Sequence, residues 1–371
     1  MRFLPTALLA SLFFVMAACS TSKQAADAAT TEPSEPAAVD HSAHSMPLTH
    51  VEADEKGRQL YGMKHDMDAE MLAEMSSKPV FQGYTPEQIV QSMQHMGPNY
   101  TWYASDSALQ GETGVIILAH GFGDHGDEVL KNQLGEMASA YPLTFAYGMS
   151  MMTSDHIQLG LNDLAEAGVT DVIVIPVVST RHNSLMRQWN YIYSLQDEPE
   201  YGRVPQVATA ANLHFVGPLD DHPLVGEIVL DYANELSQNP ENEEVIIVGH
   251  GPVDPEDNLD QLALMENLAD VVRSGGNFAA VNVVSLQDDA ARDVRMARIR
   301  ELRAMVIAAN EQGRNVLIVT NLLGTRIVQS SLRRALQGLD YSFNAKGLIQ
   351  HENFIEWINL SIEEAALTAN Q

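Results

Sequence analysis

The stretch Val115-Ile-Ile-Leu-Ala-His120-Gly-Phe-Gly-Asp124-His125-Gly-Asp127 decides the fold of this chain. Five apolar residues end in His-Gly, and a glycine-rich loop with acids and a second histidine follows. A short apolar run bounded by turn residues predicts a strand that is buried on both faces, as in a parallel sheet. The loop would then lie at the carboxyl edge of the sheet, where open α/β folds bind their ligands.

The same pattern returns as Val245-Ile-Ile-Val-Gly-His250-Gly-Pro-Val-Asp254. Two copies at a fixed offset predict an internal duplication. In both halves, apolar runs alternate with segments of helical periodicity, and crossovers of this length connect parallel strands. We therefore expect an α/β fold of two duplicated, doubly wound parallel-sheet lobes, residues 113–240 and 241–371.

The composition restricts the possible partners. Among 371 residues, 21 Lys and Arg stand against 49 Asp and Glu, a formal charge of −28. No nucleic-acid partner is expected, because phosphate neutralisation needs clustered cations. The acidity fits either a protein that handles cations or an ordinary acidic protein.

The first 40 residues predict export. Arg2 precedes an apolar run that ends in Met-Ala-Ala-Cys19, which contains the single cysteine of the chain. This pattern resembles a bacterial lipoprotein signal over residues 1–18, which implies lipidation of Cys19 and anchoring on the periplasmic side, with Ser20 favouring the outer membrane. The alternative is a plain secretory signal with an incidental cysteine. Residues 19–40 are small, polar and Pro-containing, and are expected to form a tether.

Residues 41–112 are expected to form a flexible segment rich in His and Met. The piece His41-Ser-Ala-His44-Ser-Met46 offers imidazole and thioether groups, which suit soft or borderline metals such as copper. Further on, a methionine recurs every four residues and would form one stripe on a helix. Such a stripe either packs on the main body or binds metal, and packing is the favoured interpretation. Its members are Met63, Met67, Met71 and Met75.

Three motifs point to a known family. They are strand-His-Gly at 115–121, the strand that leads to His182 at 172–182, and the segment Gly217-Pro-Leu-Asp-Asp-His-Pro-Leu224. Together with the duplication they resemble the CbiX-type class II tetrapyrrole chelatases, which include sirohydrochlorin cobaltochelatases and ferrochelatases. The resemblance covers residues 113 to about 360. It implies a cleft between the lobes, no nucleotide, and insertion of a divalent metal (Co, with Ni, Fe or Cu as alternatives) into a sirohydrochlorin-like tetrapyrrole.

In that family, two histidines of one lobe bind the metal and accept the pyrrole protons. By motif these are His120 and His182. The roles are chemically reasonable, because a neutral imidazole can hold a divalent metal loosely and can accept a ring N–H proton. His250 repeats His120, but the position of His182 aligns with Ile327, so the second lobe is expected to form a wall of the cleft.

Four more residues are candidates for the same site. Asp124 and His125 could bind or steer the cation, although acids in a first helical turn are also favoured by the helix dipole. Arg181 and Arg187 could pair with tetrapyrrole carboxylates in an otherwise acidic protein. Three functions remain open: an exported chelatase, a non-catalytic periplasmic lipoprotein that binds metal or tetrapyrrole on the same fold, and a descendant of the fold with another role.

Overall fold

The computed structural model describes residues 51–61, 67–94, 96–324 and 327–369, which all belong to one unit that spans residues 41–371. The lipoprotein signal with Cys19, the tether and the piece from His41 to Met46 lie outside the described residues and stay predictions. Within the described ranges, no helix is long and apolar enough to cross a membrane.

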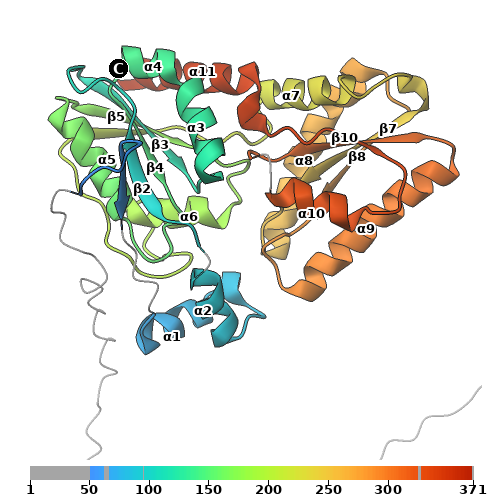
Figure 1. Ribbon diagram of the computed structural model, residues 1–371, viewed down its shortest axis with the longest axis horizontal. Coiled ribbons are helices and arrows are strands. Elements are labelled where there is room, and N and C mark those ends of the chain that lie inside the picture. Colours follow the sequence, from blue (N-terminus) through green and yellow to red (C-terminus); the bar gives the residue numbers. More distant parts are fainter. Residues whose placement is uncertain (1–50, 62–66, 95, 325–326, 370–371) are drawn as a thin grey trace, which may run out of the picture. The chain divides into compact units, whose positions relative to one another are not determined.

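Two β-sheets form the framework (Figure 1). The first has the strand order β1-β2-β4-β3-β5-β6 and the second β10-β9-β7-β8. In the first sheet β3 to β6 pair in parallel and β1 and β2 are antiparallel, whereas every pairing of the second sheet is parallel. The predicted parallel strands are confirmed. The bounds are Arg58–Tyr61 (β1), Asn99–Tyr103 (β2), Thr113–Ala119 (β3), Leu143–Tyr147 (β4), Asp171–Pro176 (β5), Asn212–Phe215 (β6), Glu243–Gly249 (β7), Ala280–Ser285 (β8), Asn315–Asn321 (β9) and Ser342–Phe343 (β10).

The central strand of each sheet is buried on both faces. In β3, Val115 and Ile117 enter one hydrophobic cluster, while Ile116 and Leu118 enter another on the opposite face. Strand β7 repeats this alternation, because successive side chains of a strand point to opposite faces. Helices therefore cover both sides of both sheets. They are Gly123–Gln133 (α3), Gly135–Ala140 (α4), Asp155–Glu166 (α5), Ser184–Ile192 (α6), Pro255–Gly276 (α8), Arg292–Glu311 (α9) and Ile327–Ala335 (α10).

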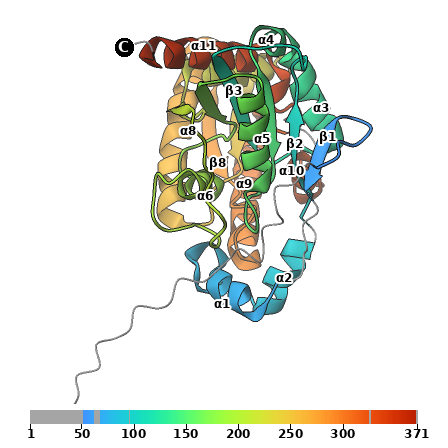
Figure 2. The same ribbon diagram turned by 90° about the vertical axis from the view of Figure 1, so that its left-hand side faces the viewer.

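Two helices connect the lobes by packing outside their own half of the sequence. Helix α7 (Pro223–Asn234) follows the first sheet but packs against α8 and β9 of the second. Helix α11 (Glu352–Ala369) follows the second sheet but packs against β5 and β6 of the first, where Figures 1 and 2 show it beside α4. Phe354, Trp357 and Ile358 of α11 share one buried cluster with Val115 and Val245. The boundary expected at residue 240 therefore divides the sequence but not the hydrophobic core.

Much of the segment before Thr113 is folded. Strands β1 and β2 extend the first sheet, and β2 pairs with β4. Helices α1 (Ala69–Ser77) and α2 (Pro86–Gln94) bury Met71, Met75 and Met93 in the cluster beneath the first sheet. The expectation of a flexible segment is wrong for these elements, and the burial of Met71 and Met75 supports packing for this part of the methionine stripe. Met63 lies outside the described residues.

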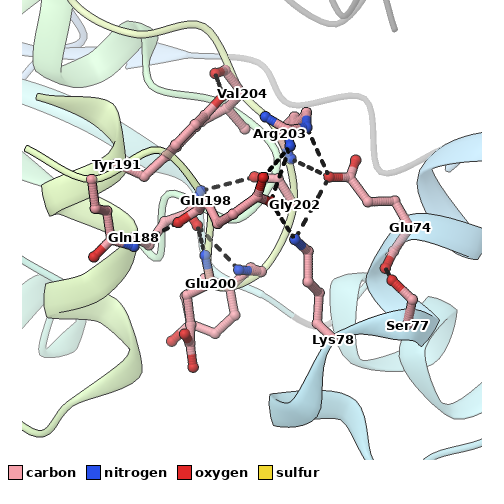
Figure 3. A network of polar contacts seen from close by, with 12 residues as sticks. Glu74, Ser77, Lys78, Gln188, Tyr191, Glu198, Glu200, Gly202, Arg203 and Val204 are labelled. Atoms are coloured by element: carbon pink, nitrogen blue, oxygen red, sulfur yellow. Dashed lines mark hydrogen bonds and ion pairs between the residues drawn. The ribbon is translucent and has the colours of Figure 1, made fainter. Parts of the chain in front are cut away.

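A polar network attaches α1 to the loop after α6 (Figure 3). The Arg203 backbone N–H donates to Glu74 Oε1 at 3.1 Å, and the Arg203 guanidinium pairs with Glu198 at 2.9 Å. The Gln188 amide donates to the Gly202 carbonyl, and its oxygen accepts from the Glu200 N–H at 3.0 Å. Because Gln188 is buried, these bonds fix the loop from inside while Glu74 fixes it from α1.

A buried histidine lies at the start of α5. His156 is fully buried, its Nε2 lies 3.2 Å from Ser150 Oγ, and Trp189 Nε1 donates to the same hydroxyl at 3.2 Å. Burial lowers the pKa of His156 to about 3. The folded protein therefore holds a neutral imidazole over a pH range in which the unfolded chain binds a proton.

This depressed pKa predicts a loss of stability in acid. Above pH 6.5 both states are neutral at this site, so His156 makes no pH-dependent contribution. Below that, protonation favours the unfolded chain, and the free energy of unfolding falls by up to roughly 1.4 kcal/mol per pH unit until the folded pKa is reached. Urea unfolding of the wild type and of His156→Gln between pH 7.5 and 4.5 measures how the free energy of unfolding depends on pH. The control is His125→Gln, because His125 is exposed. The wild type and the control are expected to lose stability more steeply than His156→Gln, and equal slopes would contradict the prediction.

Candidate functional site

His120 comes directly after the central strand β3, at the carboxyl edge of the first sheet. The chain turns away through Gly121 and Gly123, whose φ angles of +94° and +75° favour glycine. His120 is exposed to solvent, yet protein atoms surround it closely enough that desolvation lowers its pKa. The nearby charge of His250 lowers the pKa further, while a hydrogen bond to the backbone of Gly121 opposes the shift. The ring is therefore held neutral with an electron pair for a metal or a proton.

Asp127 holds the loop that carries His120. Its Oδ1 accepts the Phe122 backbone N–H at 2.6 Å, and its Oδ2 accepts the Tyr100 hydroxyl at 2.5 Å. The side chain is buried, and this burial raises the pKa of Asp127. The Phe122 ring in turn meets the His120 ring edge-on, with 5.0 Å between centroids. Tyr100 belongs to β2, so a strand from before Thr113 supports the predicted site.

Asp124 and His125 lie in the first turn of α3 and are exposed. Asp124 accepts from Arg58 at 2.7 Å and lies 3.7 Å from Lys56 Nζ. The hydrogen bond from Arg58 is the main reason that the pKa of Asp124 is lowered. Asp124 thus already has two cationic partners, and its predicted role toward a metal remains a prediction, as does that of His125.

His182 lies in the loop between β5 and α6 and faces helix α8 of the second lobe. Its Nδ1 is 3.8 Å from Asp257 Oδ1 and 3.6 Å from Asp260 Oδ2. Arg187 joins the same group, with a bidentate pair to Glu200 at 2.9 Å and a contact to Asp257 at 2.7 Å. The predicted proton acceptor is therefore adjacent to carboxylates that could pass a proton on.

The two arginines predicted for tetrapyrrole carboxylates are paired within the protein. Arg187 has the partners given above. The Arg181 side chain donates to Asp220 at 2.7 Å through Nε, and its backbone N–H donates to the same carboxylate. Arg187 would have to exchange a protein carboxylate for one of the ligand, whereas the Arg181 side chain is 63% exposed beside its contact with Asp220.

His250 and Asp289 of the second lobe are residues to which the sequence reasoning gave no role. His250 follows β7 as His120 follows β3, and its Nε2 lies 3.6 Å from Asp289 Oδ2. The charge of His250 lowers the pKa of His120, and the charge of Asp289 opposes this shift. The repeated strand-His-Gly pattern was the available signal for His250. Within the described parts of the chain, no three His, Cys, Asp or Glu side chains are already arranged as a complete metal site.

Comparison with known proteins identifies the fold of this chain. No protein-family model matches the sequence, and no curated protein sequence matches it. A structure of SirB from Bacillus subtilis with Fe³⁺ has a TM-score of 0.52 at 15% identity, over 70% of this chain and 98% of SirB. DR2241 from Deinococcus radiodurans, a multi-domain protein described as structurally similar to chelatases, has a TM-score of 0.42 at 16% identity, over 68% of this chain and 55% of its own. The likeness to SirB shows that the chain has a chelatase-like fold.

Proposed function

We propose that this protein is a metal chelatase that inserts Co(II), or alternatively Ni(II) or Fe(II), into a sirohydrochlorin-like tetrapyrrole. The observation that carries the proposal is His120: a neutral, solvent-accessible imidazole at the carboxyl edge of the central strand of a chelatase-like fold. An imidazole suits these borderline metals without holding them as tightly as a thiolate would. We further propose that the protein is exported and anchored through a lipid on Cys19.

Metal insertion exchanges one divalent cation for two protons. The metal leaves its imidazole ligand and binds the ring nitrogens, and two pyrrole N–H groups each release a proton. In this proposal His120 holds the metal and accepts one proton, and His182 accepts the other. Asp257 and Asp260 lie within 4 Å of His182 and would receive this proton before its release to water.

An insertion assay with the full chain tests this proposal. Sirohydrochlorin is mixed with Co(II), Ni(II) or Fe(II), and the tetrapyrrole absorption spectrum is followed over time. We expect catalytic turnover that falls at least about 100-fold in His120→Ala, because a general base contributes 10²–10⁴-fold. The control is His214→Ala in β6, whose ring pairs at 3.0 Å with Asp171, the first residue of β5, at the amino end of that strand and not at the carboxyl edge that carries His120.

A stoichiometric spectral change without turnover would contradict catalysis and support the second candidate, a non-catalytic binding lipoprotein. The pairing of Arg187 with Glu200 and Asp257 favours this second candidate, because these two carboxylates compete with an acidic substrate for that arginine.

Asp127 is expected to act as a positioning residue. Asp127→Ala removes the acceptor of the buried Tyr100 hydroxyl and of the half-buried Phe122 N–H, and a buried donor without an acceptor costs about 1–3 kcal/mol. Asp127→Asn keeps one acceptor oxygen and is expected to cost less. If the Asp127 carboxylate positions His120, the dissociation constant of the metal rises in both variants. It rises more in Asp127→Ala, which loses both acceptor oxygens, than in Asp127→Asn, which keeps one. Calorimetric metal titration beside thermal unfolding checks this, and a lower melting temperature with unchanged metal affinity would show that Asp127 serves stability alone.

A further inference from the structure

Helices α9 and α10 carry a large share of the positive charge of this chain. Residues 291–337, which include both helices, contain nine arginines and three acids, a formal charge of +6. The remainder of the chain carries −34, so its overall acidity conceals this cluster. Both helices cover the same face of the second sheet, since Leu302 of α9, Leu332 of α10 and Ile318 of β9 share one buried cluster (Figure 1). The positive charge is therefore gathered on two helices that pack side by side.

Most arginines of this cluster have no carboxylate partner within the protein. Elsewhere in the described ranges, Lys and Arg side chains pair with acids within 4.0 Å, as Arg58, Arg187 and Arg203 do. The described Lys and Arg side chains that make no such ion pair are Lys131, Arg292, Arg300, Arg303, Arg333 and Arg334. All of them except Lys131 belong to α9 and α10. In a protein with an excess of carboxylates, these helices leave positive charge for an anion outside the chain.

The arginines of α9 alternate with large apolar side chains along one stripe of the helix. The members of the stripe are Arg292, Met296, Arg300, Arg303 and Ile307. Their spacings of four and three residues place them on one side of an α-helix. Met296 is 41% exposed and Ile307 is 42% exposed, whereas the opposite side of α9 is buried on the sheet. Arginine beside exposed apolar side chains is typical of helices that lie on a lipid surface.

Helix α10 widens this stripe. The Arg303 guanidinium donates to the carbonyl of Ala335 in the last turn of α10 at 2.5 Å, where a cation also opposes the helix dipole. Arg333 and Arg334 in the same turn are exposed, and the Arg333 guanidinium lies 5.3 Å from the centre of the Phe343 ring. The two helices thus form one surface, called here the α9–α10 surface. It consists of Arg292, Met296, Arg300, Arg303, Ile307, Arg333 and Arg334.

We propose that the α9–α10 surface binds a lipid bilayer that contains anionic phospholipids. The arginines match the headgroup phosphates in charge, and Met296 and Ile307 can enter the boundary between headgroups and acyl chains. The rest of the chain is strongly acidic and is repelled by the same headgroups, so only this surface can approach them. The bound protein is therefore held in one orientation, with α9 and α10 against the membrane.

The lipid anchor proposed for Cys19 favours a bilayer as the occupant over an acidic protein. Even a fully extended chain between Cys19 and Val51 spans only about 110 Å, so the folded unit stays near the membrane. A tethered surface needs only weak affinity of its own, because attachment makes its binding intramolecular. The inference rests on this proposed anchor for the presence of a bilayer in the cell, and its test is made without the anchor.

Vesicle titration of a labelled full chain tests the inference. Cys19 is the only cysteine, so Cys19→Ser/Ala304→Cys has a single thiol, at an exposed position of α9 one turn from Arg300. A fluorophore that responds to an apolar environment is attached there. We expect its emission to rise with vesicles of phosphatidylcholine mixed with phosphatidylglycerol and not with phosphatidylcholine alone. The response is expected to weaken as salt is added, because salt screens exposed charges.

The charge of the surface is tested by Arg300→Gln/Arg333→Gln/Arg334→Gln in the labelled chain. Each arginine near an anionic lipid surface contributes roughly fivefold to affinity, so this triple variant is expected to bind roughly 100-fold more weakly. The matched control is Lys78→Gln/Arg273→Gln/Lys346→Gln, which removes three positive charges that pair with carboxylates on other elements. Lysine at the three positions of the surface keeps the charge and is expected to keep the affinity.

The apolar part of the surface is tested by Met296→Ser/Ile307→Ser, which is expected to weaken vesicle binding at unchanged charge. The melting temperature of each variant is measured beside the titration, because a misfolded variant would also lose binding. No response of the labelled chain to vesicles with phosphatidylglycerol would overturn the inference, as would equal affinity of the arginine triple variant and its control. Binding of a polyglutamate peptide or an oligonucleotide without binding of vesicles would assign the surface to another class of partner. Metal insertion is measured independently, so each of these outcomes leaves the proposed chelatase intact.

Discussion

The burial of β3 and β7 on both faces is the constraint on which the rest of the structure depends. A strand that is apolar on both sides can offer polar chemistry only where it ends, because water does not reach its middle. His120 and His250 stand at those ends, and the parallel pairing brings neighbouring strand ends, including the one before His182, to the same edge. The position of the candidate site thus follows from the same hydrophobic effect that forms the sheets.

The loops at this edge are rigid because buried polar groups hold them. Asp127 binds the loop after β3, and Gln287 connects the loops after β7 and β8. In each case a buried side chain would leave unpaired donors or acceptors if the loop moved, and this cost keeps the imidazoles in place. Part of the support comes from before Thr113, through Tyr100 on β2 and Tyr84 beside α2. The segment before Thr113 therefore supports the candidate site structurally.

The features that could be predicted from the sequence are those that a short segment carries by itself. The apolar runs, the alternating helices and the strand-end positions of His120 and His182 are properties of short segments, and periodicity reveals them. The pairing of β1 with β2 and of β2 with β4 was missed, since both are short strands that join partners distant in sequence. The partners of Arg181 and Arg187 were missed for the same reason: Asp220, Glu200 and Asp257 are brought to them only by the fold. Asp289 carries no local signal at all, because its relation to His250 depends on the parallel pairing of β7 with β8.

Helices α7 and α11 each pack against the lobe to which they do not belong in sequence, and this sets the order in which the chain can fold. The first sheet is synthesised early, but one of its faces is covered by α11, whose residues are the last described residues of the chain. Until Glu352–Ala369 leave the ribosome, the first lobe lacks part of its core, so its folding cannot be completed during synthesis of the second. A chain built in this way stays incompletely folded until α11 has been synthesised, and neither lobe can be separated from the other by simple truncation.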